Sequence, residues 1–105
     1  MEVIVDQLVL RAKEYIEDRY RDISRVQEIA RALGVDYELL RKQVPRETGK
    51  TLISLLHEKR IAQASVLLET TSMKLYAIAR EVGYETEVTL AQFFKRSTGI
   101  TPAEY

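Results

Sequence analysis

A phrase that occurs twice limits the fold of this 105-residue chain more than any other feature of its sequence. The segment IARALG, residues 29–34, returns 49 residues later as IAREVG, residues 78–83. A second pair follows, RETGKT at residues 46–51 and RSTGIT at residues 96–101, with an offset of 50 residues. One residue is therefore inserted between the two phrases of the second copy. The repeat predicts that one supersecondary motif occurs twice in a small chain.

Each copy of the repeat carries the signals of two helices separated by a short turn. Apolar residues recur at three- and four-residue spacing along the chain, as one face of a helix requires, and strand signals are almost absent. Gly34 and Gly83 can adopt the positive φ that ends a helix, and Asp36 and Thr86 can cap the helices that follow. Two such units are typical of helix-turn-helix motifs.

The expected fold is all-α, with about seven helices and two helix-turn-helix subdomains joined by a long linker helix. The first subdomain, with a leading helix, would span residues 1–50, the linker helix residues 51–69, and the second subdomain residues 70–105. The expected helices span about residues 3–20, 24–33, 37–44, 52–69, 72–82 and 87–97, and a last short helix starts at TPAE, residues 101–104.

Local signals refine this prediction at several positions. The segment SRVQ predicts a capping box between Ser24 and Gln27. Pro45 is expected to end or kink the helix that begins at Tyr37, because proline lacks the N–H donor and crowds the carbonyl four residues earlier. Tyr84 is expected to pack rather than to stack on a base. The apolar positions expected along the helices include Val5, Leu8, Ala12, Ile16, Tyr20, Leu39 and Val44, and those expected in the core are Leu40, Ile78, Ala79, Leu90 and Phe94.

The composition excludes several classes of protein. The chain is 46% hydrophobic and 30% charged, which is typical of one ordered globular unit. It contains no Cys and one His, so a disulfide framework, a thiol nucleophile and a Cys-rich zinc site are excluded. No apolar run is long enough to span a bilayer, and the acidic N-terminus does not resemble a signal peptide. The chain is expected to be soluble and cytoplasmic, without membrane contact.

Two short segments resemble parts of enzyme motifs, but neither is complete. TGKT, residues 48–51, lacks the upstream glycine of a phosphate-binding loop, because Val44 occupies that position and no strand precedes it. His57 and Glu58 lack the second histidine of a zinc protease helix. We therefore expect no catalytic residues, no metal site and no cofactor, and the chain is not predicted to be an enzyme.

The charges cancel over the whole chain but not locally. There are 16 basic and 16 acidic residues, and residues 41–60 contain six bases and two acids, a local charge of +4. Such a distribution suits contact with a phosphate backbone. A solvated helix face explains the charges alone about equally well.

The second half of the chain, from Arg60 to Tyr105, resembles the signature of the AraC/XylS family of bacterial transcription regulators. The resemblance extends less densely back to Asp22 and rests on residues spread over three segments. These are Arg60, Ile61, Ala64, Leu67 and Leu68; Ile78, Ala79, Val82, Gly83 and Tyr84; and Phe94, Lys95, Thr98, Gly99, Thr101, Pro102 and Tyr105. It implies double-stranded DNA as the partner, with recognition helices at about residues 37–44 and 87–97 entering successive major-groove faces.

The family's reading positions map onto exposed-type residues of both recognition helices. Arg41, Lys42 and Gln92 have the donors that guanine and adenine accept, glutamate can accept from cytosine, and Val88 can contact a thymine methyl. The implied base contacts are Glu38, Arg41, Lys42, Glu87, Val88 and Gln92. The implied phosphate contacts, which hold register without reading sequence, are Arg46, Thr86, Lys95 and Arg96.

The resemblance also carries expectations beyond this domain. Family members usually join it to a sensing or receiver domain, RNA polymerase is a candidate partner, and the domain itself is expected to be monomeric. The alternative is a degenerate helix-turn-helix module that acts mainly in protein–protein interaction. An exposed apolar patch on the first helix or the linker would favour that alternative over a basic groove.

Overall fold

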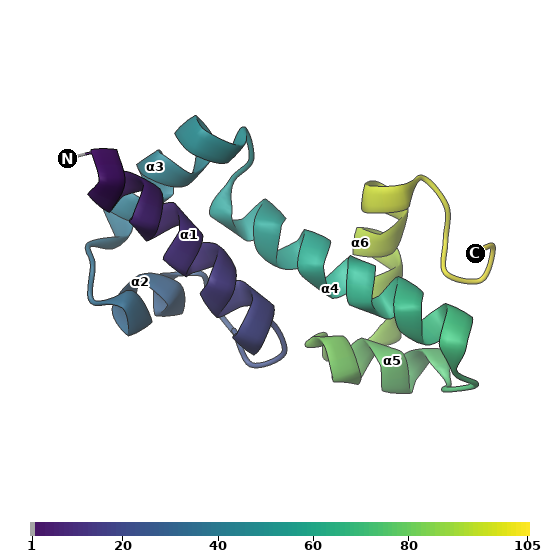
Figure 1. Cartoon of the computed structure of the whole chain (residues 1–105). Helices are drawn as coiled ribbons and strands as arrows, with labels where there is room; N and C mark the ends of the chain where they lie inside the picture. The colour runs from purple at the N-terminus through teal and green to yellow at the C-terminus, as the bar shows by residue number, and fades with distance from the viewer. Residues whose placement is uncertain (1) are drawn as a thin grey trace. The chain divides into compact units, whose positions relative to one another are not determined.

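The computed structural model describes the backbone of residues 2–105 and the side chains of residues 7–105. The predicted apolar position Val5 lies outside the described side chains. The described backbone folds into six helices without a strand, which confirms the all-α prediction (Figure 1). None of the described helices is long and apolar enough to cross a membrane. The helices are α1 (Glu2–Arg19), α2 (Gln27–Leu33), α3 (Tyr37–Thr48), α4 (Leu52–Thr70), α5 (Leu75–Val82) and α6 (Glu87–Thr98).

The segment expected to start a seventh helix forms a turn instead. A capping box is present there: Thr101 N–H donates to Glu104 Oε1 at 2.9 Å, and Glu104 N–H donates to Thr101 Oγ1 at 3.3 Å. The described helices end at Thr98, and residues 102–104 are a turn. A single turn fixes several backbone dihedrals for few hydrogen bonds, so a cap without further helical residues does not make a helix.

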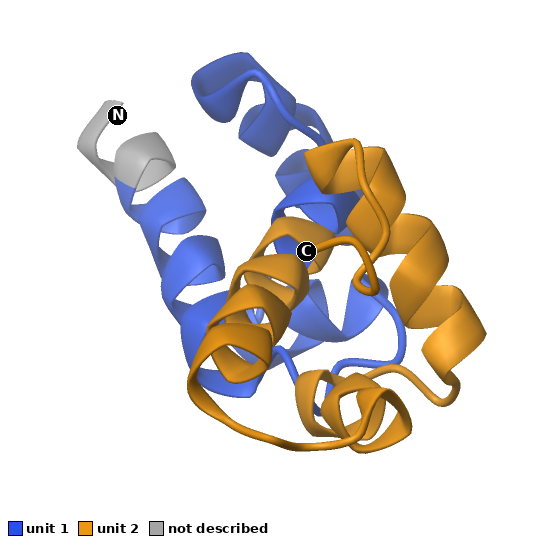
Figure 2. Cartoon of the chain, turned by 90° about the vertical axis from the view of Figure 1, so that its right-hand side faces the viewer, with its two compact units in different colours: residues 1–56 blue, residues 57–105 orange. Residues whose placement is uncertain are grey.

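The chain divides into two compact units, residues 1–56 and residues 57–105 (Figure 2). The division falls within α4, whose first residues belong to unit 1 and whose remaining residues belong to unit 2. The helix that we expected as a separate linker, residues 51–69, therefore contributes to both units.

Unit 1 has a small apolar core under α1. This helix packs against α2 and α3, and α2 packs against α3. Leu40 and Val44 of α3 are buried as predicted, whereas Leu39 is 46% exposed. Leu39 is five residues before Val44, which places the two side chains on roughly opposite sides of the helix. Leu39 therefore turns toward solvent. The buried residues of α1 and the turn after it are Leu8, Val9, Ala12, Ile16, Tyr20 and Ile23.

Unit 2 has its core between α5 and α6, which pack against each other. The positions predicted for this core are confirmed, because Ile78, Ala79, Leu90 and Phe94 are all fully buried. Tyr84, in the turn between the two helices, is buried as well, in agreement with a packing role. The apolar stripe of α4 adds Ile61 and Ala64.

The start of α2 differs from the predicted capping box. Val26 occupies the cap position without a side-chain cap bond, and the helix begins at Gln27. Glu28 reaches back instead, so that its carboxylate accepts from the N–H groups of Ser24 at 3.4 Å and Arg25 at 3.1 Å. As predicted, a side chain satisfies N–H groups at the start of the helix. The acceptor is the Glu28 carboxylate rather than the side chain of Gln27.

Pro45 does not end α3, which was the first of the two effects that we expected of it, an end or a kink. The helix continues for three more residues to Thr48, and the N–H of Gly49 donates to the Pro45 carbonyl at 2.9 Å. Proline lacks only its own N–H, so the Arg41 carbonyl loses its usual donor four residues ahead while later hydrogen bonds can still form. The first recognition helix therefore spans residues 37–48 rather than 37–44.

The two copies of the repeat have the same local structure from cap to cap. Asp36 Oδ2 accepts from Leu39 N–H at 3.3 Å, and Thr86 Oγ1 accepts from Thr89 N–H at 3.2 Å, so α3 and α6 begin alike. Both helices have 12 residues. Since Gly34 precedes its cap by two residues and Gly83 precedes its cap by three, the inserted residue lies in the turn and leaves the helix intact.

The same correspondence holds where α3 and α6 end. The Thr48 hydroxyl donates to the Val44 carbonyl at 2.7 Å, and the Thr98 hydroxyl donates to the Phe94 carbonyl at 2.8 Å. Each hydroxyl oxygen also accepts the N–H two residues further along. We call this arrangement the threonine turn. It occurs at equivalent residues of both helices, each of which ends at a left-handed glycine, Gly49 or Gly99, so α3 and α6 match at an offset of 50.

Candidate nucleic-acid interface

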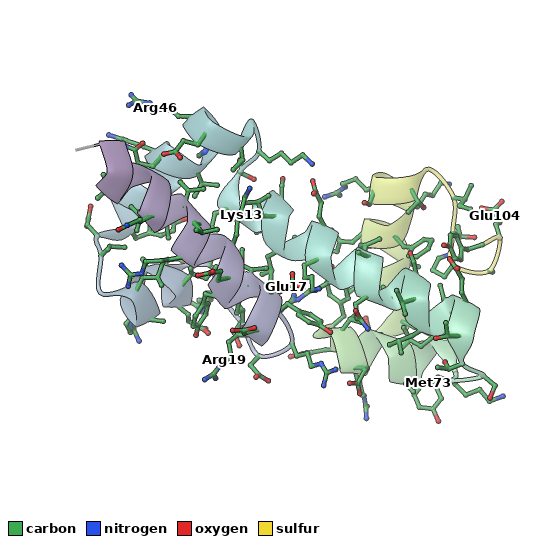
Figure 3. The ribbon with its side chains drawn as sticks, in the orientation of Figure 1. Lys13, Glu17, Arg19, Arg46, Met73 and Glu104 are labelled. Carbon is green, nitrogen blue, oxygen red and sulfur yellow. The ribbon has the colours of Figure 1, made fainter. Side chains whose placement is uncertain are left out.

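All ten residues predicted to contact DNA have exposed side chains. Six lie on α6 or at its cap, and four lie on α3. Figure 3 shows Arg46 extending away from the ribbon near the end of α3. The structure therefore leaves every predicted contact residue accessible, while the contacts themselves remain predictions. The exposed residues are Glu38, Arg41, Lys42, Arg46, Thr86, Glu87, Val88, Gln92, Lys95 and Arg96.

The exposed side of α6 borders a surface groove. Val88, which is 63% exposed, and Gln92 lie one helical turn apart on this side, and basic side chains follow one turn later. The groove also includes Ala91 and Thr101, which were not among the predicted DNA contacts, and excludes Glu87. Its lining residues are Val88, Ala91, Gln92, Lys95, Arg96 and Thr101.

The exposed side of α3 carries an ion pair instead of an apolar residue. Glu38 Oε1 accepts from Arg41 Nη2 at 2.8 Å and from Nε at 3.2 Å, and Oε2 accepts from Nε at 3.2 Å. The hydrogen bonds from Arg41 lower the pKa of Glu38, and Glu38 in turn raises the pKa of Arg41. Both groups are charged at neutral pH. Glu38 and Arg41, two of the predicted base contacts, therefore form an ion pair with each other in the absence of DNA.

Thr86 has a structural role before any contact with DNA. Its oxygen accepts the N–H of Thr89 at the start of α6, and the two hydroxyl oxygens lie 3.1 Å apart. The Thr86 hydroxyl hydrogen can go to Thr89 or to an outside acceptor. A phosphate contact by Thr86 is therefore compatible with its role as a cap.

Behind the groove, three flat rings from α4, the turn and α6 lie parallel. His57 and Phe93 have centroids 3.8 Å apart at 9°, and Tyr84 is 5.5 Å from Phe93 at 7°. The Arg60 guanidinium lies 5.2 Å from the Tyr84 ring centre, and that of Arg96 lies 5.2 Å from the Phe93 ring centre. The ring stack His57–Phe93–Tyr84 therefore packs against Arg96, one of the predicted phosphate contacts.

The ring stack fixes the protonation state of His57. Tyr84 accepts a hydrogen bond from Arg60, so its own hydrogen can be donated to His57 Nδ1, 2.6 Å away. Burial, followed by the charges of Arg60 and Arg96, lowers the pKa of His57 to about 4. Burial raises the pKa of Tyr84 to about 12. At neutral pH His57 is therefore neutral, and donation from the Tyr84 hydroxyl to Nδ1 corresponds to the tautomer with its proton on Nε2.

Sequence reasoning missed the ring stack because its members are far apart in the chain. His57 and Tyr84 are 27 residues apart, and Phe93 adjoins Phe94, which fills the core. The His57 side chain on α4 is half-buried.

Two capped helix pairs, each with a glycine turn and an exposed second helix, define a chain with two helix-turn-helix motifs. A family profile described as a helix-turn-helix domain matches residues 29–105. The chain belongs to the AraC/XylS family of helix-turn-helix transcription regulators.

Known proteins and structures resemble nearly the whole chain. It is 28% identical over 102 residues to the arabinose operon regulatory protein of Escherichia coli K12, covering 96% of this chain and 35% of that protein. The C-terminal domain of AraT, a response regulator from Geobacillus stearothermophilus, matches with a TM-score of 0.88 and 31% identity, covering 93% of this chain and 82% of that chain. The DNA-binding domain of AdpA, solved in complex with a target DNA, matches with a TM-score of 0.78 and 25% identity over 96% of this chain and 87% of that chain. The chain thus spans about a third of the length of the arabinose regulator.

Proposed function

We propose that this chain binds double-stranded DNA in a sequence-specific manner, as the DNA-binding domain of a bacterial transcription regulator. The observation that carries the proposal is the α6 groove, where Val88 and Gln92 can meet base edges while Lys95 and Arg96 can meet phosphates. The likeness to the AdpA domain, solved with its target DNA, supports it.

The residues of α6 favour a block that contains A·T pairs. A glutamine amide can bond both N6 and N7 of adenine, and an apolar side chain can contact the thymine methyl group. Gln92 and Val88 line the same groove and lie one helical turn apart, so they can reach neighbouring base pairs. Glu87 does not line the groove. If it contacts a base, its carboxylate can accept a hydrogen bond from cytosine N4.

The residues of α3 favour a block that contains G·C pairs. Arg41 and Lys42 offer donors to guanine O6 and N7. Arg46 lies one turn after Lys42, where it can contact a phosphate. We therefore expect two short blocks of different composition, separated by about one turn of the double helix as in other two-reader proteins.

The same proposal extends to the compartment, the further domains and the partners of the regulator. A regulator of this type acts in the cytoplasm, carries a sensing or receiver domain in addition to this one, and has RNA polymerase as a partner. This domain binds as a monomer, because it holds both motifs in one chain. Catalysis, cofactors and metals have no role in the proposed activity.

The structure offers little support for the protein-binding alternative. Among the side chains that the structure describes, the large apolar ones exposed on α1 and α4 are Leu10, Ile53 and Val66. Ile53 and Val66 are separated by about 20 Å along α4 at the usual helical rise. Single exposed apolar residues are normal on globular proteins, whereas the α6 groove combines apolar and basic groups in one place.

The test is selection of duplexes from a randomised pool at two salt concentrations, followed by sequencing of the retained DNA. We expect two short blocks about one helical turn apart, bound more weakly at high salt. Gln92→Ala should remove the preference for adenine at one position, and Gln7→Ala, an exposed glutamine on α1, is the matched control. A single block would mean that one motif does not read bases, and retention of no duplex would reject the proposal.

A further inference from the structure

The ion pair of α3 leaves one edge of Arg41 unoccupied. A guanidinium carries its donors along a side edge, Nε and Nη2, and an end edge, Nη1 and Nη2. Glu38 takes the side edge, because its carboxylate accepts from Nε and Nη2 at 2.8–3.2 Å. The end edge keeps two parallel N–H donors, the arrangement that matches O6 and N7 of guanine. The carboxylate therefore orients Arg41 without consuming the donors that a base needs.

The second copy of the repeat shows that this pair is not required to form the helix. At the offset of 50 residues, Val88 corresponds to Glu38 and Ala91 corresponds to Arg41. The α6 helix has the same length, the same type of N-cap and the same threonine turn without a charged pair at these positions. Exposed ion pairs also contribute little to folding stability. A role outside folding is therefore the better explanation of the pair.

Exclusion of water by bound DNA would strengthen the Glu38–Arg41 ion pair. In solvent the pair is weak, but at a DNA surface the effective dielectric constant falls, and a guanidinium held by a carboxylate remains in one orientation. The Glu38 carboxylate also repels nearby phosphates, so it opposes movement of Arg41 from a base to the backbone. Both effects raise the ratio of specific to nonspecific binding.

We propose that Glu38 and Arg41 act as one reading unit, in which Glu38 holds Arg41 by its side edge so that the end edge reads a single guanine. This inference rests on the proposed DNA binding and adds a division of labour within it. Arg41 contacts the base, and Glu38 is a positioning residue that makes no base contact of its own.

The experiment compares single and double variants of the full chain on the selected duplex and on its single-base changes at each position. Arg41→Ala should lower the preference for guanine at one position by roughly tenfold, which is within the range for a bidentate contact. Glu38→Ala should lower the preference at the same position while binding random duplexes as tightly as the unaltered chain or more tightly. The double variant should be no worse than Arg41→Ala, because the two residues share one contact.

Two further variants separate orientation from charge. Arg41→Lys keeps the charge but loses the two-donor edge, so it should lose guanine preference while it retains affinity for random duplexes. Glu14→Gln removes an exposed acid from α1 and should leave base preference unchanged. Helical circular dichroism of each variant confirms that it has folded.

Three results would overturn the proposal. Glu38→Ala could leave guanine preference intact, it could change preference at another base pair, or its effect could add fully to that of Arg41→Ala. Each of these leaves the proposed DNA binding untouched, because the unaltered chain still selects a site. Failure of the unaltered chain to retain any duplex would instead reject DNA binding itself, and this inference with it.

Discussion

At the scale of single residues, the side chains that pack α6 against the rest of its unit differ from those that it exposes, with Arg96 as the exception. His57, Tyr84 and Phe93 stack beneath the helix, while Val88 and Gln92 lie on its open side. Arg96 belongs to both groups, because its guanidinium covers Phe93 and also lines the groove. Changes in the ring stack can therefore be expected to affect stability first and DNA binding through Arg96.

His57 should make the stability of the fold depend on pH. Folding lowers its pKa from 6.5 to about 4, so the unfolded chain binds the proton more readily. The stability that neutral His57 contributes is full above about pH 6.5 and is lost as pH falls toward 4. The melting temperature should therefore fall more steeply in this range for the unaltered chain than for His57→Gln. Parallel pH profiles would contradict the assignment.

Gly83 should tolerate alanine less well than Gly34. Both have positive φ, +108° and +71°, where a side chain costs about 1–2 kcal/mol. A Cβ at Gly83 would also lie 2.8 Å from Arg60 Nε, whereas a Cβ at Gly34 would meet nothing within 4 Å. Gly83→Ala should lower the free energy of unfolding more than Gly34→Ala does in denaturant titrations. Equal losses would mean that the buried Arg60 side chain moves aside at little cost.

At the scale of helices, the sequence predicts the elements well and their irregularities poorly. Periodic apolar residues and the caps Asp36 and Thr86 place α3 and α6 correctly, because both signals are local. The capping box predicted at the start of α2 was wrong because Glu28, rather than Gln27, accepts the Ser24 N–H. The predicted end of α3 near residue 44 was wrong because the helix continues through Pro45, which removes only one N–H donor. Side-chain arrangements such as the Glu38–Arg41 pair depend on rotamers that no local pattern specifies.

Pro45 offers a test of how α3 meets DNA. Its equivalent in α6 is Lys95, so Pro45→Lys adds a positive charge at a position that faces phosphates in the proposed interface. This variant should bind all duplexes more tightly. Pro45→Gln is the matched control, since it also restores an N–H for the Arg41 carbonyl but adds no charge.

Both Pro45 variants should raise the free energy of unfolding, by up to about 3 kcal/mol. Titrations with the selected duplex and with random duplexes measure the change in affinity. If Pro45→Gln tightened binding as much as Pro45→Lys, the geometry of the helix rather than its charge would be responsible.

At the scale of the whole molecule, balanced charge and DNA binding are compatible. Sixteen bases and sixteen acids cancel, but the salt dependence of binding follows the number of phosphates neutralised rather than net charge. With Arg46, Lys95 and Arg96 as the charged phosphate contacts, log K should fall with log salt at a slope of about −2.7.

Lys95→Ala should reduce this slope to about −1.8 and weaken all duplexes alike. Lys13, an exposed lysine of α1, provides the control, because Lys13→Ala should leave the slope unchanged (Figure 3). A loss of preference at one base pair would instead assign Lys95 to base reading.

The threonine turns have a consequence for how such a protein changes over evolutionary time. They lie at equivalent ends of α3 and α6 and bond Thr48 or Thr98 to the backbone, and the exposed positions between cap and turn take no part in them. Mutations at those positions can therefore alter what one copy recognises while the helix that presents them stays the same. Under the proposed reading of two blocks, a lineage can exchange one block of its target sequence and keep the other block unchanged.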